Sequence, residues 1–220
     1  MDIKSIESLV ATATEQNKKI SDIVIDIEAN SQKVDRNKVI EQMSSYYDIM
    51  RESVINGKKD KFNFVTGLQE DCVDIVEKFY KNKKSILGET IGEVVTAAMA
   101  VSGYNACMGK IIAAPTAGSC GIMPAVLTVC ENRGYKREYI VNSMFTAAGL
   151  ADIIAQLATF AGAGGGCQAE CGSASAMAAC ACAEIMGGTP EQCANAFALS
   201  LSAILGLVCD PIAGFVEVPC

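Results

Sequence analysis

The sequence predicts an all-α protein, a compact helical domain in which buried glycine-rich loops converge on one site. Apolar residues recur at helical spacing, and Ile20, Ile23, Val24 and Ile27 form one such stripe. No segment shows the alternation of β-branched and polar residues that pairs strands, and there is no β–α–β rhythm. Half of the 220 residues are hydrophobic, and small side chains dominate the second half. Small side chains let helices pack closely, so these observations together favour a helical core.

The helices can be placed in order along the chain. Residues 3–30 are expected to form one long helix. Asp35 is expected to cap a second helix that continues to about Asn56, where Gly57 offers a stop. Thr189 begins a capping-box pattern with proline at the first helical position, and that helix is expected to reach about Val208. The remaining helices are expected over residues 69–81, 89–108, 122–134, 138–160 and 173–186.

Charge divides the single expected domain, residues 1–220, into two parts. Residues 1–88 form a charged helical part, and residues 89–220 form an apolar helical core that carries the site loops. The net charge of −7 argues against nucleic acid or an anionic membrane surface as a partner. The uncharged stretch 192–209 approaches the length of a membrane span, but polar residues interrupt it and acidic residues flank it. A buried core helix is therefore expected there, with no membrane association.

The absence of histidine restricts the possible chemistry, and the cysteine content indicates the cellular compartment. The chain contains no histidine, which excludes a Ser-His-Asp triad, a Cys-His dyad, a His-containing zinc site and a histidine general base within it. Eleven cysteines in a chain without a recognisable secretory signal are expected to stay reduced. A cytoplasmic location is therefore expected.

Three segments of the apolar half contain few charges and lie between helices: residues 115–121, 162–172 and 209–220. Buried irregular backbone must satisfy its own polar groups, so three such loops suggest convergence on a site. The first loop leads into a helix N-terminus, where free amides and the helix dipole suit a carboxylate. Thr116 and Ser119 add hydroxyl groups. An ordinary capped turn is the alternative interpretation.

Three cysteines occupy the other two loops. Cys167 is separated from Cys209 by 42 positions, and Cys209 is separated from Cys220 by 11. The chain has no run of the ferredoxin type, so general motif rules do not assign a cluster. From the residues alone, these thiols could bind a metal or pack as small hydrophobic groups, which is the expectation for most of the other cysteines.

These loops resemble the α subunit of iron–sulfur-dependent L-serine dehydratase. The matching segments are Gly109–Pro124 (GKIIAAPTAGSCGIMP), Gly164–Glu170 (GGGCQAE) and Cys209–Cys220 (CDPIAGFVEVPC). The resemblance covers essentially the whole chain and implies an all-α fold and a separate β subunit as partner. It also implies conversion of L-serine to pyruvate and ammonia.

The resemblance further implies roles for individual residues. Cys167, Cys209 and Cys220 would hold a 4Fe–4S cluster with one open iron, which would stabilise the leaving hydroxide as a Lewis acid. The turn formed by Thr116, Ala117, Gly118 and Ser119 would bind the substrate carboxylate. The base that removes the α-proton is not identified, and Lys110 is a weak candidate because it lies near the turn.

Two departures from the family pattern are visible. The chain stops at Cys220, where family members are expected to continue through a further helical stretch, and small residues differ at Ala117 and Ser119. Three other interpretations stay open. They are an L-cysteine desulfidase with related chemistry, a non-catalytic cluster-carrying or structural subunit, and a zinc site built from four cysteines.

Overall fold

The computed structural model describes residues 3–59, 71–82 and 85–207. All regular secondary structure in these ranges is helical, which confirms the predicted all-α class. The α-helices are α1 (Ile6–Glu15), α2 (Ile20–Gln32), α3 (Arg36–Lys59), α4 (Cys72–Lys81), α5 (Gly88–Ala106), α6 (Ile122–Asn132), α7 (Arg137–Leu157), α8 (Gly162–Cys167), α9 (Ser173–Ile185) and α10 (Pro190–Ala203). A short π-helix, η1 (Gln168–Gly172), connects α8 to α9.

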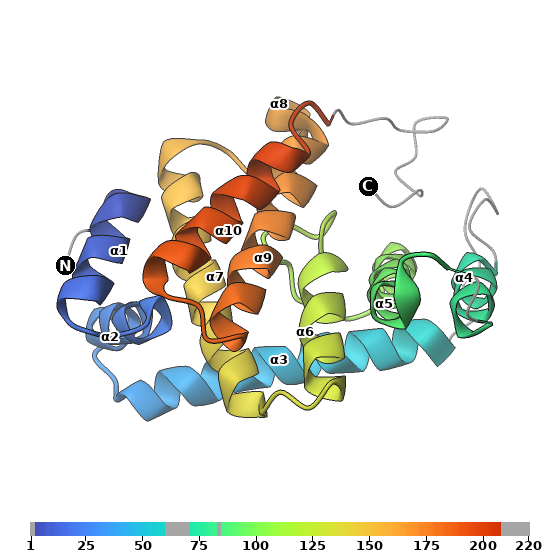
Figure 1. The fold of residues 1–220 in the computed structure, drawn as a ribbon, viewed down its shortest axis with the longest axis horizontal. Helices are drawn as coiled ribbons and strands as arrows, with labels where there is room; N and C mark the ends of the chain where they lie inside the picture. Colours follow the sequence, from blue (N-terminus) through green and yellow to red (C-terminus); the bar gives the residue numbers. More distant parts are fainter. Residues whose placement is uncertain (1–2, 60–70, 83–84, 208–220) are drawn as a thin grey trace.

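Helix α3 lies along the long axis of the molecule (Figure 1). It connects the end formed by α1 and α2 to the opposite end formed by α4 and α5. Helix α9 packs against α6, α7 and α10, and it therefore forms the centre of the helical core. Helix α8 lies beside the C-terminal end of α10, so the glycine-rich segment and the end of the last described helix share one region of the fold.

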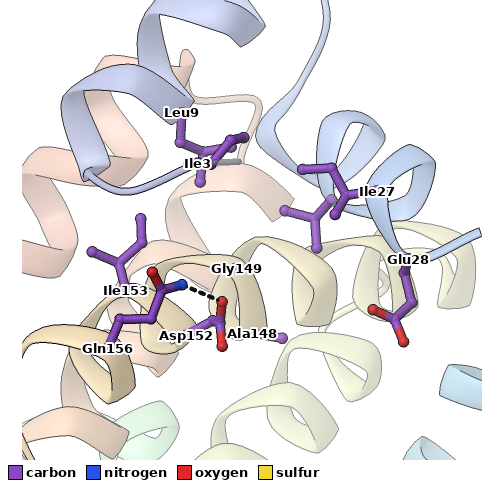
Figure 2. A pocket seen from close by; sticks show the side chains of 10 residues that line it. Ile3, Leu9, Ile27, Glu28, Ala148, Gly149, Asp152, Ile153 and Gln156 are labelled. Carbon is purple, nitrogen blue, oxygen red and sulfur yellow. Dashed lines mark hydrogen bonds between the residues drawn. The ribbon is translucent and has the colours of Figure 1, made fainter. Parts of the chain in front are cut away.

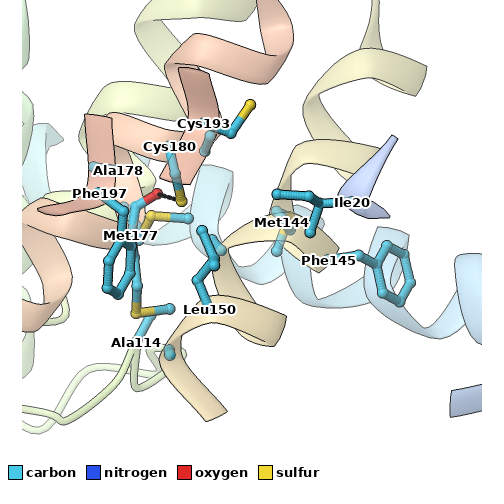
Figure 3. Close-up of a cluster of buried hydrophobic side chains, with 14 of the residues drawn as sticks. Ile20, Ala114, Met144, Phe145, Leu150, Met177, Ala178, Cys180, Cys193 and Phe197 are labelled. Carbon is cyan, nitrogen blue, oxygen red and sulfur yellow. Dashed lines mark hydrogen bonds between the residues drawn. The ribbon is translucent and has the colours of Figure 1, made fainter. Parts of the chain in front are cut away.

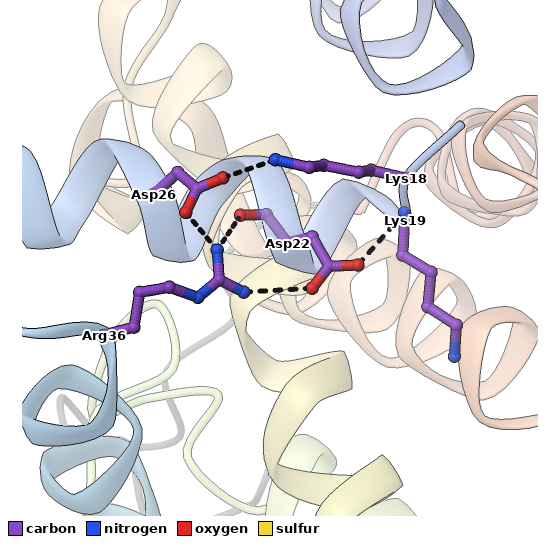
Figure 4. A network of polar contacts seen from close by, with 5 residues as sticks. All are labelled: Lys18, Lys19, Asp22, Asp26 and Arg36. Atoms are coloured by element: carbon purple, nitrogen blue, oxygen red, sulfur yellow. Dashed lines mark hydrogen bonds and ion pairs between the residues drawn. The ribbon is translucent and has the colours of Figure 1, made fainter. Parts of the chain in front are cut away.

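The expectation of one helix over residues 3–30 is wrong, because the chain turns between α1 and α2. Asn17 adopts a left-handed conformation with φ of 52°, which asparagine tolerates better than most residues. A polar network then holds the corner (Figure 4). Lys18 pairs with Asp26 at 2.9 Å, and Arg36 at the start of α3 pairs with both Asp22 and Asp26. The hydrogen bond from Lys18 and the charge of Arg36 lower the pKa of Asp26.

Two predicted helix ends are also wrong. Helix α3 continues through Gly57 to Lys59, because Gly57 serves close packing and not termination. A Cβ atom at Gly57 would lie 2.3 Å from the backbone oxygen of Ala100 in α5, closer than any real contact. Helix α10 ends at Ala203, before the expected Val208, and Gly206 follows with φ of 96°. A glycine in this left-handed conformation is a usual helix terminator.

The largest buried side chains join α10 to the rest of the core. Phe197 of α10 is 1 % exposed and belongs to the same buried cluster as Leu150 of α7 and Met177 of α9 (Figure 3). Ala114, which precedes the loop 115–121, is a member of this cluster too. The core therefore anchors the start of that loop.

One described helix, α7, is long and apolar enough to cross a membrane by length and composition alone. More than half of its apolar window is buried inside the protein, and it packs against α2, α3 and α9. It is therefore a core helix in this structure. Of the stretch 192–209, considered above as a possible span, only residues up to Ala203 are helical in the described part of the chain, as part of the 14-residue α10.

A carboxylate is buried in this core. Glu184 of α9 is 2 % exposed, and its Oε2 accepts a hydrogen bond from the hydroxyl of Thr146 in α7. Its Oε1 has no hydrogen-bond partner among the described residues. Burial raises the pKa of Glu184, and hydrogen bonds from Ser21 and Thr146 oppose that effect only in part.

Glu184→Gln is expected to weaken the pH dependence of stability. A raised pKa means that the folded protein holds the proton at pH values where the unfolded chain has released it. Stability should therefore fall as pH rises from about 4.5 through the folded pKa. The glutamine variant should lack this slope and gain on the order of 1 kcal/mol of unfolding free energy at neutral pH. Urea unfolding across pH measures both effects, with Glu41→Gln on the surface as control. An unchanged slope in Glu184→Gln would contradict the assignment.

Candidate functional site

The turn 115–121 lies between α5 and α6 and is held from both sides. The side-chain amide of Asn105, near the end of α5, donates to the backbone oxygen of Ala117 at 3.0 Å. The hydroxyl of Ser119 faces the backbone oxygen of Thr116 at 3.4 Å. Ser119 is buried at 2 % exposure, whereas Ala117 and Gly118 are exposed. The turn is thus fixed on its inner side and open on its outer side.

Backbone amides of this turn lack a hydrogen-bond acceptor among the described residues. Within the ranges that the structure describes, the amides of Ala117, Gly118 and Ser119 donate to no acceptor. They precede the first turn of α6, where the helix dipole adds positive potential. Three such donors beside a helix N-terminus can bind an anion such as a carboxylate.

The glycine-rich segment 162–172 differs from the expected buried loop. It is helical, with α8 continuing into the π-helix η1, and the only non-helical backbone inside α8 is at Gly166, with φ of 67° and ψ of −167°. The segment is also partly open, because residues 163–165 are exposed. Glycine allows the reversal at Gly166 without a steric penalty. This reversal is followed directly by Cys167, which is buried at 7 % exposure.

Glu170 joins the two segments. Its Oε1 accepts a hydrogen bond of 2.7 Å from the hydroxyl of Thr116, whose oxygen is also 3.2 Å from that of Ser119. A Cβ atom at Gly118 would lie 2.9 Å from Oε1, and a Cβ atom at Gly162 would lie 2.5 Å from Oε2. A larger residue at either position would therefore displace the carboxylate of Glu170 from its place between them. The turn and the glycine-rich segment, 54 residues apart at this contact, form one site.

Sequence reasoning did not identify Glu170 as part of the site. A signal was present, because Glu170 is the only charged residue between Asp152 and Glu184. An isolated carboxylate within a small, apolar, glycine-rich stretch needs a local partner, and here the Thr116 hydroxyl provides one.

Gln168, next to Cys167, connects the site to the end of α10. Its backbone amide donates to the oxygen of Leu207 at 3.3 Å, and its side-chain amide donates to the oxygen of Leu201 at 3.0 Å. The last described residue of the chain therefore lies beside the segment that carries Cys167.

The other predicted site residues stand as follows. Cys209 and Cys220 lie outside the described residues, so their roles stay predictions. Lys110 is exposed and makes no hydrogen bond or ion pair within the described part of the chain, and its role as base also stays a prediction. The described residues contain no group of three potential metal ligands. That finding does not test a ligand set with two members outside the described ranges.

Several remaining cysteines behave as packed hydrophobic groups. Burial raises the pKa of Cys120 and of Cys193 to about 11, and it raises that of Cys180 as well. These buried thiols lie among the apolar side chains of the helical core, as expected for most of the cysteines on helices.

A cavity of about 380 Å³ lies between α1, α2 and α7 (Figure 2). Its walls include the apolar residues Ile27, Gly149 and Ile153. The acidic residues Glu28 and Asp152 also line it. None of the predicted site residues lines it. This cavity is therefore separate from the site formed by the turn and the glycine-rich segment.

Comparison with known proteins gives consistent results. The model of one protein family, described as serine dehydratase alpha chain, matches residues 15–220. The chain is 38 % identical to the "L-serine dehydratase, alpha chain" of Peptoniphilus asaccharolyticus, covering 99 % of this chain and 75 % of that protein. It is 39 % identical to the "Probable L-serine dehydratase, alpha chain" of Bacillus subtilis (strain 168), covering 99 % and 72 %. With "L-serine dehydratase TdcG" of Escherichia coli (strain K12), identity is 43 % over 56 % of this chain and 28 % of that protein.

Proposed function

Because the chain belongs to the family of serine dehydratase alpha chains, we propose that it is the α subunit of an L-serine dehydratase. The reaction would be the loss of water from L-serine, followed by hydrolysis of the resulting enamine or imine to pyruvate and ammonia. The enzyme would thus be a carbon–nitrogen lyase. The proposal includes a β subunit as partner, as the names of the relatives suggest.

The observation that supports this function most is the contact between Thr116 and Glu170. It brings an amide-rich turn, suited to a carboxylate, against the segment that carries a buried thiol, Cys167. An amino-acid lyase needs both a grip on the substrate carboxylate and a group that activates the leaving hydroxyl.

The turn would hold the substrate carboxylate. The free amides of Ala117, Gly118 and Ser119 would donate to its oxygens, and the hydroxyl of Thr116 lies at the same turn. Fixing the carboxylate orients the α- and β-carbons, and such orientation contributes strongly to rate. Lys110 stays a weak candidate for the base that accepts the α-proton.

The thiols of this chain fit an iron–sulfur cluster in their chemistry, because cysteine thiolates are the usual ligands of such clusters. Cys167 would be one ligand, and Cys209 and Cys220 the others. The backbone oxygen of Leu207 accepts a hydrogen bond from the backbone amide of Gln168. Cys209 follows Leu207 by two positions in the sequence. When bound, the cluster would supply a Lewis acid for the departing hydroxide.

The open outer side of the site is consistent with a partner. Ala117, Gly118 and residues 163–165 are exposed on the two segments that Glu170 joins. A lyase site must exclude bulk water during the reaction. We therefore place the β subunit over this face. The proposal also includes a cytoplasmic location, where thiols stay reduced.

Anaerobic reconstitution tests the function. The α chain with its β subunit should bind iron and sulfide, show cluster absorbance and form pyruvate from L-serine. Zinc without iron would contradict the cluster, and faster turnover of L-cysteine would favour a desulfidase. Cluster binding without turnover of either amino acid, in the presence of the β subunit, would indicate a non-catalytic subunit.

A further inference from the structure

We propose that Glu170 recognises the α-ammonium group of the substrate and so selects amino acids over hydroxy acids. The inference rests on the proposed function and extends it to a residue that neither motif spacing nor the ligand set had identified. The carboxylate of Glu170 contacts the turn 115–121. That turn is proposed to bind the carboxylate of the substrate, the group opposite in charge to its ammonium.

Glu170 brings a negative charge to the turn 115–121. A carboxylate beside an anion-binding turn would repel an incoming carboxylate unless the ligand also carries a positive group. Glu170 is the only carboxylate with a hydrogen bond to the described residues of this turn. A turn with three free amides and one adjacent carboxylate is complementary to a zwitterion, in which ammonium and carboxylate are separated by one carbon.

Oε1 of Glu170 is 2.7 Å from the hydroxyl oxygen of Thr116, and the α-carbons of Gly118 and Gly162 face the two carboxylate oxygens closely. The absence of side chains at these glycines brings the carboxylate against the backbone of the turn. A ligand whose carboxylate lies at the amides of residues 117–119 therefore has its α-substituents within reach of Glu170.

The experiment compares two ligands that differ in one group. L-serine and β-hydroxypropionate share a carboxylate and a β-hydroxyl, but only serine carries an ammonium group. On the anaerobic αβ holoenzyme, serine binding is followed by its KM in turnover, and β-hydroxypropionate binding is followed by its inhibition of that turnover. In the unmodified protein, serine should bind at least about tenfold more tightly than β-hydroxypropionate. Equal affinities would overturn the proposal without any variant.

Glu170→Gln keeps the size of the side chain and an oxygen that can accept from Thr116, but removes the charge. It should weaken serine binding about 10- to 100-fold and leave β-hydroxypropionate binding unchanged or tighter. Glu170→Asp, which keeps the charge on a shorter side chain, should retain part of the selectivity.

Two outcomes in Glu170→Gln would overturn the proposal while leaving the proposed function intact. Equal weakening of both ligands would show a purely structural connection between the two segments. Unchanged serine affinity with loss of kcat alone would show a proton acceptor. If the unmodified holoenzyme neither binds nor converts serine, the proposed function fails, and this inference fails with it.

Discussion

Replacing Cys167 with alanine is expected to remove both the proposed cluster and the activity. Cys167 is buried directly after the backbone reversal at Gly166. The next residue, Gln168, donates hydrogen bonds to the backbone oxygens of Leu201 in α10 and of Leu207 beyond it. Loss of one of the three proposed thiolate ligands should leave iron and sulfide content at background. Pyruvate formation should fall by more than about 100-fold, which exceeds the effect typical of losing a supporting contact around a metal. Iron and sulfide analysis and a pyruvate assay measure these effects.

The same result is expected for Cys209→Ala and Cys220→Ala. Cys107→Ser is the matched control, because Cys107 is an exposed thiol at the end of α5 and outside the proposed ligand set. This control should keep its cluster and its activity. Full cluster content and activity in Cys167→Ala would refute the ligand assignment.

Phe197→Ala is expected to cause a large loss of stability. Phe197 is 1 % exposed and belongs to the buried cluster that includes Leu150, Met177 and Ala114 (Figure 3). Truncation of a buried phenylalanine leaves a cavity and typically costs about 3–5 kcal/mol. That is a large fraction of the total stability of an ordinary domain. Urea unfolding followed by circular dichroism measures the change.

Leu199→Ala provides the control in the same helix. Leu199 is 69 % exposed, so its truncation should change the unfolding free energy by no more than about 0.5 kcal/mol. Comparable losses in the two variants would show that Phe197 does not anchor α10 to the core. Because Ala114 belongs to the same cluster and precedes the turn 115–121, Phe197→Ala should also weaken serine binding in the holoenzyme.

Much of the helical layout could be predicted from periodicity, because most helices bury one apolar face. The predicted ranges of α5, α6, α7 and α9 agree with the structure to within a few residues. The failures have local or tertiary causes. The corner at Asn17 needs neither glycine nor proline, and it is held by charges that belong to three elements. Gly57 resembles a helix stop in sequence, but its role depends on Ala100, 43 residues away.

The site was predicted in outline only. The turn 115–121 and the segment 162–172 were expected to converge, and the contact between Thr116 and Glu170 brings them together. The helical form of the glycine-rich segment could not be predicted, because so many glycines disfavour a helix by propensity alone. The part played by Glu170 depends on a partner 54 residues earlier in the chain, which no local pattern encodes.

Helix α9 also restricts how this protein can change over evolutionary time. Six of its nine buried positions are alanine, serine or cysteine, and neighbouring helices pack on it from three sides. Nearly every larger residue would therefore need compensating changes in two or three other helices at once.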